Sequence, residues 1–219
     1  MPTYVKIILG LHIAAGFSVL ITGILVYLLR KGNQPHRQLG WIYYWSMMGI
    51  CLTGVGLITY RFNPFLLLIT VLTFYLSYSG VFSFQRTKGK PGTFDLIAAG
   101  IAAGTGLWGL GYGIYAFIRV GGFQPFGLLF IFFGLLLGVS AKNDLKWYRD
   151  PEIMTGKWRI EYHIVRMGAS FIAATTAFSL AGAFRFIGNW EYGWTLWIIP
   201  TLIGTPLIRY YKRNYFKRT

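Results

Sequence analysis

Acidic residues are scarce in this sequence, which contains 6 aspartates and glutamates against 21 lysines and arginines. Charged residues of both signs make up only 12% of the chain, whereas soluble domains average about 25%. This scarcity argues against a soluble domain. The net charge of +15 is what basic loops beside anionic lipid headgroups produce. No basic run is long enough to indicate nucleic-acid binding.

Cysteine and histidine are also rare. The single cysteine, Cys51, excludes an intrachain disulfide and any CxxC metal or redox motif. There are only three histidines. No GxSxG, HExxH, P-loop or dinucleotide-binding motif occurs. The sequence therefore carries no established catalytic motif, and it leaves enzymatic activity undecided.

Apolar residues are abundant: they make up 55% of the chain. They come in runs of about 20, the length at which an α-helix crosses ~30 Å of hydrocarbon. Within lipid, a helix satisfies its own backbone hydrogen bonds. The sequence therefore predicts an all-α fold, a polytopic transmembrane bundle of seven helices in one domain, residues 1–219. The expected helices cover residues 7–29, 40–60, 64–84, 95–118, 125–141, 160–184 and 193–209, and 142–159 is expected as one long polar loop.

Basic residues predict the orientation of the bundle. Most of the 21 lysines and arginines lie in alternate connecting segments and in the carboxyl-terminal tail, which fall on one side. By the positive-inside rule, this side is cytoplasmic and the amino terminus is outside. The first run, 7–29, is longer than the apolar part of a signal peptide, so it is expected to be a membrane helix. We expect a multi-pass protein of the cell (inner) membrane, in contact with an anionic inner leaflet.

Small residues predict which helices pack closely. The expected helix 95–118 carries two small-xxx-small pairs, and 160–184 carries a stripe of serine and alanine. Such residues let helix backbones approach each other within a membrane, so we expect these two helices to be central. The pairs are Gly100 with Gly104 and Gly109 with Gly113, and the stripe is Ser170, Ala174, Ala177 and Ala181.

The histidines are expected at two depths. His12 lies in the outer half of the first helix, where it can bond a neighbouring backbone or hydroxyl group or contact a polar ligand. His36 follows Pro35 at the start of the second helix, and His163 opens the sixth, both on the predicted cytoplasmic side. His12 is too far along its helix to share a compact site with the other two. A three-histidine zinc site is therefore not expected, and no other metal site is predicted.

Charged residues beside His163 extend this candidate site. Arg166 follows at i+3 on the same helical face, and Glu161 precedes it. Arg166 needs a carboxylate, a phosphate or a carbonyl as its partner, unless it snorkels to the inner headgroups. Asp144 alternates with lysines and arginines, which is typical of a solvated segment. The expected ligand-binding residues are His36, Arg37, Tyr43, Tyr44, Glu161, His163 and Arg166.

One group of residues carries a family resemblance: His12 with Gly16, then His36-Arg37-Gln38-Leu39-Gly40 with Tyr43 or Tyr44 behind it. In this group the chain resembles a family of bacterial multi-pass membrane proteins of unknown function that share an HRxxG motif after the first helix. The resemblance covers most of the chain and brings no activity with it. A looser likeness is to cytochrome b561-type haem proteins. These need two histidine pairs for two haems, so three histidines allow at most one bis-histidine haem here.

Two classes of function are compatible with these residues. The first is a binding or transport protein, in which a cytoplasm-facing cavity lined by His36, Glu161, His163 and Arg166 holds a small anionic or amphipathic ligand. The second is an electron-transfer protein with one haem b between His36 and His163. The hypothesis of a metal-dependent membrane hydrolase has less support, because the sequence offers few residues that could ligate a metal. The first class needs the fewest additional components, and a homo-oligomer is left open.

Overall fold

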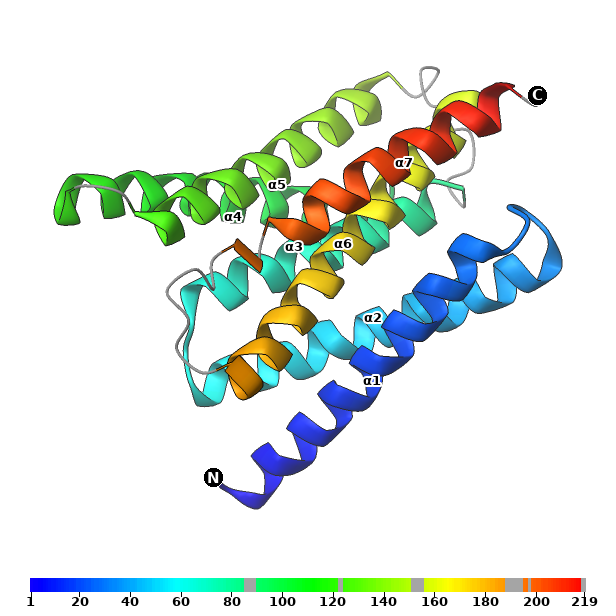
Figure 1. Ribbon diagram of the computed structural model, residues 1–219. Helices are drawn as coiled ribbons and strands as arrows, with labels where there is room; N and C mark the ends of the chain where they lie inside the picture. The colour runs from blue at the N-terminus through cyan, green and yellow to red at the C-terminus, as the bar shows by residue number, and fades with distance from the viewer. Residues whose placement is uncertain (85–89, 122–123, 151–155, 188–194, 197, 218–219) are drawn as a thin grey trace.

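The chain forms a bundle of α-helices in the computed structural model (Figure 1). The structure describes residues 1–84, 90–121, 124–150, 156–187, 195–196 and 198–217. Within these residues there are seven helices and no strands, as the sequence predicts. The helices are α1 (Thr3–Leu28), α2 (Gln34–Tyr60), α3 (Pro64–Phe82), α4 (Thr93–Val120), α5 (Pro125–Arg149), α6 (Lys157–Ile187) and α7 (Ile199–Lys217).

Five of the helices, α1 to α5, are long and apolar enough to cross a membrane, judged on the described residues. Asparagine caps start two of them. The side chains of Asn33 and Asn63 accept hydrogen bonds from the first turns of α2 and α3, and each helix has a proline at its first or second position. These are the usual signals of a helix start. The predicted multi-pass helical bundle is confirmed, and the orientation of its termini stays a prediction.

The prediction of one long polar loop over residues 142–159 is wrong. α5 continues to Arg149 and α6 begins at Lys157, while residues 151–155 lie outside the described part of the chain. The continuation is amphipathic, since Asp144 is buried and Lys142 and Lys146 are exposed. An amphipathic turn at the end of an apolar helix therefore looked like a loop in the sequence.

The last helix also differs from its prediction. It runs from Ile199 to Lys217 rather than over 193–209. The expected beginning, 193–194, lies outside the described residues. Because the helix extends beyond the apolar run, the basic and aromatic tail belongs to the folded bundle. Tyr211, for example, packs its ring 5.4 Å from that of Tyr27 in α1.

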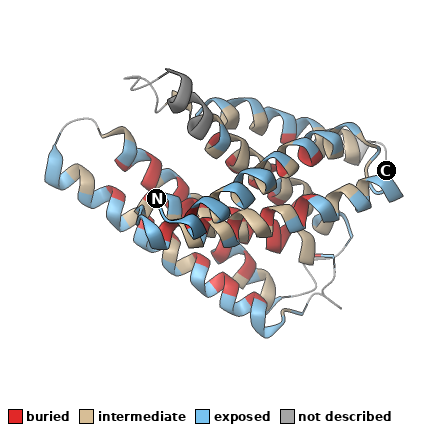
Figure 2. Cartoon of the chain, turned by 90° about the horizontal axis from the view of Figure 1, so that it is seen from below, coloured by how far each residue is buried: buried red, intermediate tan, exposed pale blue. Residues whose placement is uncertain are grey.

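α3 lies at the centre of the bundle. It contacts α2, α4, α5 and α6, and Leu68, Leu72 and Tyr75 are fully buried in the main apolar core. Around it, α1 pairs with α2, α4 with α5, and α6 with α7. The prediction that α4 is central is wrong, because α4 packs chiefly on α5 and leaves its other face exposed. Figure 2 shows the buried residues on the inward faces of the helices and the exposed residues on their outer faces.

Glycines bring α4 and α5 into backbone contact. A Cβ atom at Gly106 would lie 2.7 Å from the backbone nitrogen of Gly138 and 2.9 Å from the carbonyl oxygen of Gly134. A Cβ atom at Gly100 or Gly104, the first predicted packing pair, would meet open space. The contact face of α4 is therefore rotated away from that pair.

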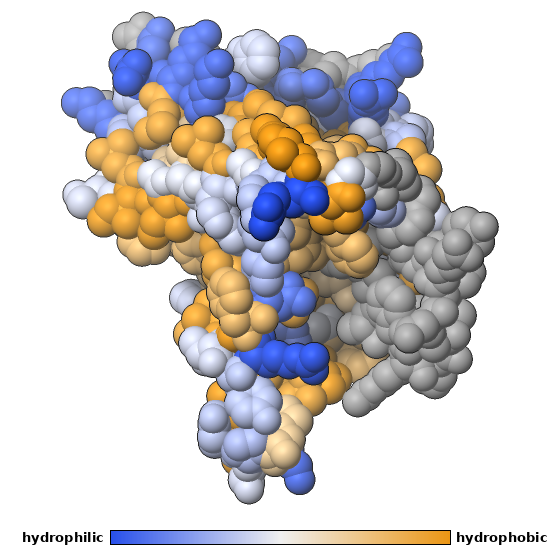
Figure 3. Space-filling model, turned by 90° about the vertical axis from the view of Figure 1, so that its left-hand side faces the viewer, coloured by the Kyte–Doolittle hydropathy of each residue, from blue (hydrophilic) through white to orange (hydrophobic). Residues whose placement is uncertain are grey.

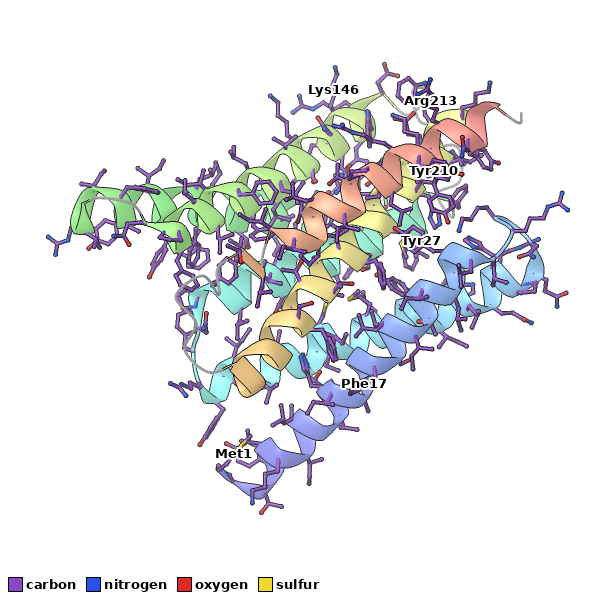
Figure 4. All side chains as sticks on the ribbon, viewed as in Figure 1. Met1, Phe17, Tyr27, Lys146, Tyr210 and Arg213 are labelled. Atoms are coloured by element: carbon purple, nitrogen blue, oxygen red, sulfur yellow. The ribbon has the colours of Figure 1, made fainter. Side chains whose placement is uncertain are left out.

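Apolar side chains cover much of the outside of the bundle. Figure 3 shows groups of apolar residues below a polar upper edge, with further polar residues at the centre and towards the bottom of the face that it presents. Leu52, Leu107 and Ile118 are among the exposed apolar residues, which lipid tails would cover. Lys146 and Arg213 lie at one end of the bundle, and Met1 lies at the other (Figure 4). We call the end that holds the carboxyl ends of α1, α3, α5 and α7 the basic end.

Candidate functional site

A cavity of about 460 Å³ lies at the basic end, between α1, α2, α6 and α7. Its volume is within the roughly 300–1,000 Å³ of typical small-molecule sites. Most of its wall is apolar or aromatic. Four of the residues expected from the sequence line it, namely His36, Arg37, Tyr43 and His163. We call this space the histidine cavity.

His36 reaches the cavity from the first turn of α2. The side-chain oxygen of Asn33 accepts a hydrogen bond from the backbone nitrogen of His36 at 2.9 Å, which fixes the start of the helix. The Nδ1 atom of His36 is buried and has no hydrogen-bond partner within the described residues. Leaving a buried polar atom unpaired costs about 1–3 kcal/mol. Within the described residues, Nη1 of Arg166 and the hydroxyl of Ser77 are also buried and unpaired, so this feature is not particular to the cavity.

His163 reaches the cavity from α6 and is held in place by α3. Its Nδ1 donates a hydrogen bond to the carbonyl oxygen of Gly80 at 2.9 Å, because a carbonyl oxygen can only accept. In the neutral ring, Nε2 then keeps the free lone pair. The two helices are close here, since a Cβ atom at Gly80 would lie 2.9 Å from the Cβ of Arg166. The orientation of the imidazole is therefore set by backbone packing.

Lys31 also lines the cavity, although it is not among the ligand-binding residues expected from the sequence. Its Nζ donates to the carbonyl oxygens of Val26 and Tyr27 at 2.7 and 2.9 Å and lies 4.6 Å from the centre of the Tyr211 ring. A positive φ of 81° at Gly32 turns the chain where these bonds form. Burial lowers the pKa of Lys31 to about 8. The sequence could have indicated this contact, because a lysine just after the end of a helix and before a glycine often bonds the last carbonyl oxygens of that helix.

Lys31 has no acidic partner among the residues that the structure describes. The ion pairs of the described residues join Arg166 to Asp144 and Lys212 to Glu161. Arg37, which is exposed at the edge of the same cavity, adds a second positive charge. The histidine cavity thus combines an apolar wall with two cations that lack a described acidic partner.

Arg166 does not line the histidine cavity. It faces α3 and α5, where its Nη2 donates to Asp144 at 2.7 Å and to the carbonyl oxygen of Ser140 at 3.0 Å. The hydroxyls of Tyr75 and Tyr162 donate to the other carboxylate oxygen of Asp144. Arg166 is 5% exposed and Asp144 is fully buried. We call Asp144, Arg166, Tyr75 and Tyr162 the ionic centre.

Glu161 and Tyr44 also lie outside the cavity wall. Glu161 forms an ion pair with Lys212 of α7. Tyr44 is buried against α3, where its ring lies 5.9 Å from that of Phe82. The structure therefore brings four of the expected residues to one cavity and places Glu161, Tyr44 and Arg166 at contacts between helices.

The prediction that Asp144 is solvated is wrong. Its carboxylate is the acceptor that Arg166 needs, as expected for a buried arginine. The sequence holds a signal for this position, because Asp144 continues the spacing of the buried face of α5. Its charged neighbours obscured that periodicity. The buried stripe is Phe130, Phe133, Leu137, Ala141 and Asp144.

His12 lies in α1, away from the residues that line the cavity. Its Nδ1 donates to the hydroxyl oxygen of Thr53 at 2.9 Å, because the Thr53 hydroxyl itself donates to the carbonyl oxygen of Gly49 at 2.6 Å. This is the hydroxyl-bonded histidine that the sequence offers as one alternative. His12 therefore joins α1 to α2.

Within the described part of the chain, no three His, Cys, Asp or Glu side chains are grouped so that they could hold a metal ion. His36 and His163, which both line the cavity, are of a residue type that can ligate a haem iron. Comparisons with protein families, with curated proteins and with solved structures gave no match for this chain.

Proposed function

We propose that this membrane protein binds a small amphipathic anion in the histidine cavity. The observation that carries the proposal is one cavity of about 460 Å³ that combines an apolar, aromatic wall with the cations Lys31 and Arg37. A ligand with a negatively charged head and an apolar body matches both parts. The position at the basic end suits exchange of this ligand with the predicted cytoplasmic side, whether for transport or for binding alone.

The head of the ligand is assigned to the side of the cavity formed by Lys31 and Arg37. The ammonium of Lys31 is held by two carbonyl oxygens, so its position is set before a ligand arrives. Arg37 offers a planar guanidinium that suits phosphate or carboxylate oxygens. His36 lines the same cavity.

The body of the ligand is assigned to the wall formed by α1, α2 and α6. Val26, Trp41 and Phe171 line this part. A Cβ atom at Gly40 would meet open space, so Gly40 leaves room for the ligand. A larger side chain there would occupy the cavity without a backbone clash.

Binding of two single-chain lipids tests the proposal. The probes are lysophosphatidylglycerol, which is anionic, and lysophosphatidylcholine with the same acyl chain, which has no net charge. Native mass spectrometry of the detergent-purified protein gives their dissociation constants. Wild type should bind the anionic lipid more tightly, and Lys31→Met should weaken that binding about fivefold, as expected for one basic residue beside an anionic lipid.

The matched control is Arg30→Met, because Arg30 is the exposed neighbour of Lys31 and does not line the cavity. It should leave both dissociation constants unchanged. Gly40→Leu should weaken binding of both lipids, since it fills the space rather than removing a charge. Equal binding of both lipids by wild type and by the Lys31 and Gly40 variants would refute the proposal.

A second candidate function is electron transfer by one haem b between His36 and His163. Two observations favour it: both rings line one cavity, and His163 bonds Gly80 through Nδ1, which leaves Nε2 for a metal. The apolar wall and the open space beside Gly40 also fit a flat group. A haem bound there would supply one-electron chemistry, and Lys31 and Arg37 would face its carboxylates.

An absorption spectrum distinguishes the two candidates. Protein purified from haem-replete cells should show a Soret band if the haem candidate is right, and His36→Ala or His163→Ala should abolish it. His12→Ala is the matched control, because His12 bonds Thr53 outside the cavity. A colourless preparation would exclude haem and leave the amphipathic anion.

A further inference from the structure

A second hollow, of about 330 Å³, lies between α5, α6 and α7. α7 separates it from the histidine cavity. Tyr211 and Tyr215 line the cavity, whereas Ile208, Arg209 and Lys212 line the second hollow. The two spaces therefore lie on different sides of one helix. We call the second hollow the α5–α7 groove.

The length of the α5–α7 groove matches one leaflet of a bilayer. The groove extends along α7 from Thr201 to Lys212 and along α6 from Val165 to Thr176. Each stretch is roughly 16 Å long, at about 1.5 Å per residue. This is about half of the ~30 Å hydrocarbon core. A groove of this length suits a chain that enters from one side and ends near the middle of the membrane.

Charge is confined to one end of the groove. The residues along its length include Phe132, Leu136 and Ile172, whereas Arg209 and Lys212 lie one helical turn apart at the basic end. Arg209 is exposed, and no acidic residue in the described part of the chain pairs with it. The groove thus has an apolar body and a cationic mouth.

We propose that the α5–α7 groove binds one acyl chain of an anionic phospholipid from the leaflet at the basic end, with the phosphate on Arg209 and Lys212. Charge complementarity selects an anionic headgroup, and the length of the groove selects a chain that spans one leaflet. This site is separate from the histidine cavity, because the two have no lining residue in common.

Glu161 has a defined part in this site. It pairs with Lys212 at the mouth of the groove, so it competes with the phosphate for that ammonium group. Removing the carboxylate would free Lys212 for the lipid. Glu161 therefore lowers the affinity of the groove for an anionic phospholipid, whereas Arg209 raises it.

Native mass spectrometry with dioleoyl phosphatidylglycerol and dioleoyl phosphatidylcholine tests the site on the detergent-purified full chain. Wild type should bind the anionic lipid more tightly than the zwitterionic one. Arg209→Gln should weaken binding of the anionic lipid about fivefold, to near the affinity for the zwitterionic lipid. Glu161→Gln should strengthen it, a gain that misfolding cannot produce.

The matched control is Arg213→Gln, on the same helix, because Arg213 is exposed and does not line the groove. It should have a smaller effect than Arg209→Gln. Equal losses in the two arginine variants, or no preference of wild type for the anionic lipid, would overturn the proposal. Lys31→Met should not alter this binding. A loss with Lys31→Met but not with Arg209→Gln would place the phospholipid in the histidine cavity and refute the groove site alone.

Discussion

The two sides of α6 differ in how their charged groups are matched. On the side of α3 and α5, Asp144 accepts hydrogen bonds from Arg166, Tyr75 and Tyr162 with no solvent exposure. On the side of α1 and α2, Lys31 and Arg37 line a cavity and have no acidic partner among the described residues. The first side is closed and its charges are matched, so it holds helices together. The second is open and positively charged, so it is suited to a ligand.

Removing Asp144 should have the largest effect on the closed side. Asp144→Ala leaves Arg166 buried without a carboxylate, which costs about 3–5 kcal/mol when one partner of a buried pair is lost. We expect a drop of this size in the free energy of unfolding, measured by denaturation in mixed micelles. Asp150→Ala is the matched control, since Asp150 is exposed just beyond α5. Equal stability of the two variants would show that the ionic centre does not stabilise the fold.

A double variant sharpens this result. Asp144→Ala with Arg166→Met removes both charges, so no unpaired ion remains in the interior. The double variant should be more stable than Asp144→Ala alone, which gives a coupling energy between the two residues. If the two substitutions were simply additive, the pair would not act as a unit.

The backbone contact of α4 with α5 should give the next largest effect. Gly106→Ala would push a methyl group to within 3 Å of Gly138 and Gly134, which costs about 1–3 kcal/mol by overpacking. Gly104→Ala, on the same helix, enters open space and should be neutral or slightly stabilising. Thermal unfolding of the two variants compares them directly. A destabilised Gly104 variant beside a normal Gly106 variant would reverse the assignment of the contact face.

The smallest expected effect is the change with pH in ligand binding at the histidine cavity. Burial lowers the pKa of Lys31 to about 8, so its amine loses its charge as the pH rises through that value. Binding of lysophosphatidylglycerol should therefore weaken between pH 7 and 9, by about fivefold at most, because Arg37 stays charged. The probe keeps one negative charge over this range.

The same titration on Lys31→Met provides the control. Its dissociation constant should be independent of pH over that interval, because the titrating amine is absent. Arg30→Met should retain the dependence of wild type. A slope that persists in the Lys31 variant would assign the effect to another group of the protein.

The sequence predicts the bundle well because membrane physics leaves few alternatives. Apolar runs of about 20 residues must be helices. Alternating directions then bring the ends of α1, α2 and α6 to one side, which is why His36 and His163 share a cavity. The order of the helices and the lengths of the apolar runs were therefore sufficient to predict that these two histidines lie at the same end of the bundle.

The rotation of each helix about its axis could not be predicted in the same way. Arg166 lies three residues after His163, yet it faces α3 and α5, because α6 has neighbours on several sides. When a helix has other helices on several sides, the spacing of its apolar residues does not show which face contacts which neighbour. Asp144 was missed for a related reason: the partner that explains its burial lies on another helix.

α7 is the partition between the two hollows, with Tyr211 on one side and Arg209 on the other. A ligand in one hollow that displaced α7 would reduce the volume of the other hollow. The two occupancies would then be thermodynamically linked, and each guest would alter the other's dissociation constant by the same factor. The lipid composition of the membrane would in that case affect how tightly the histidine cavity binds the proposed amphipathic anion.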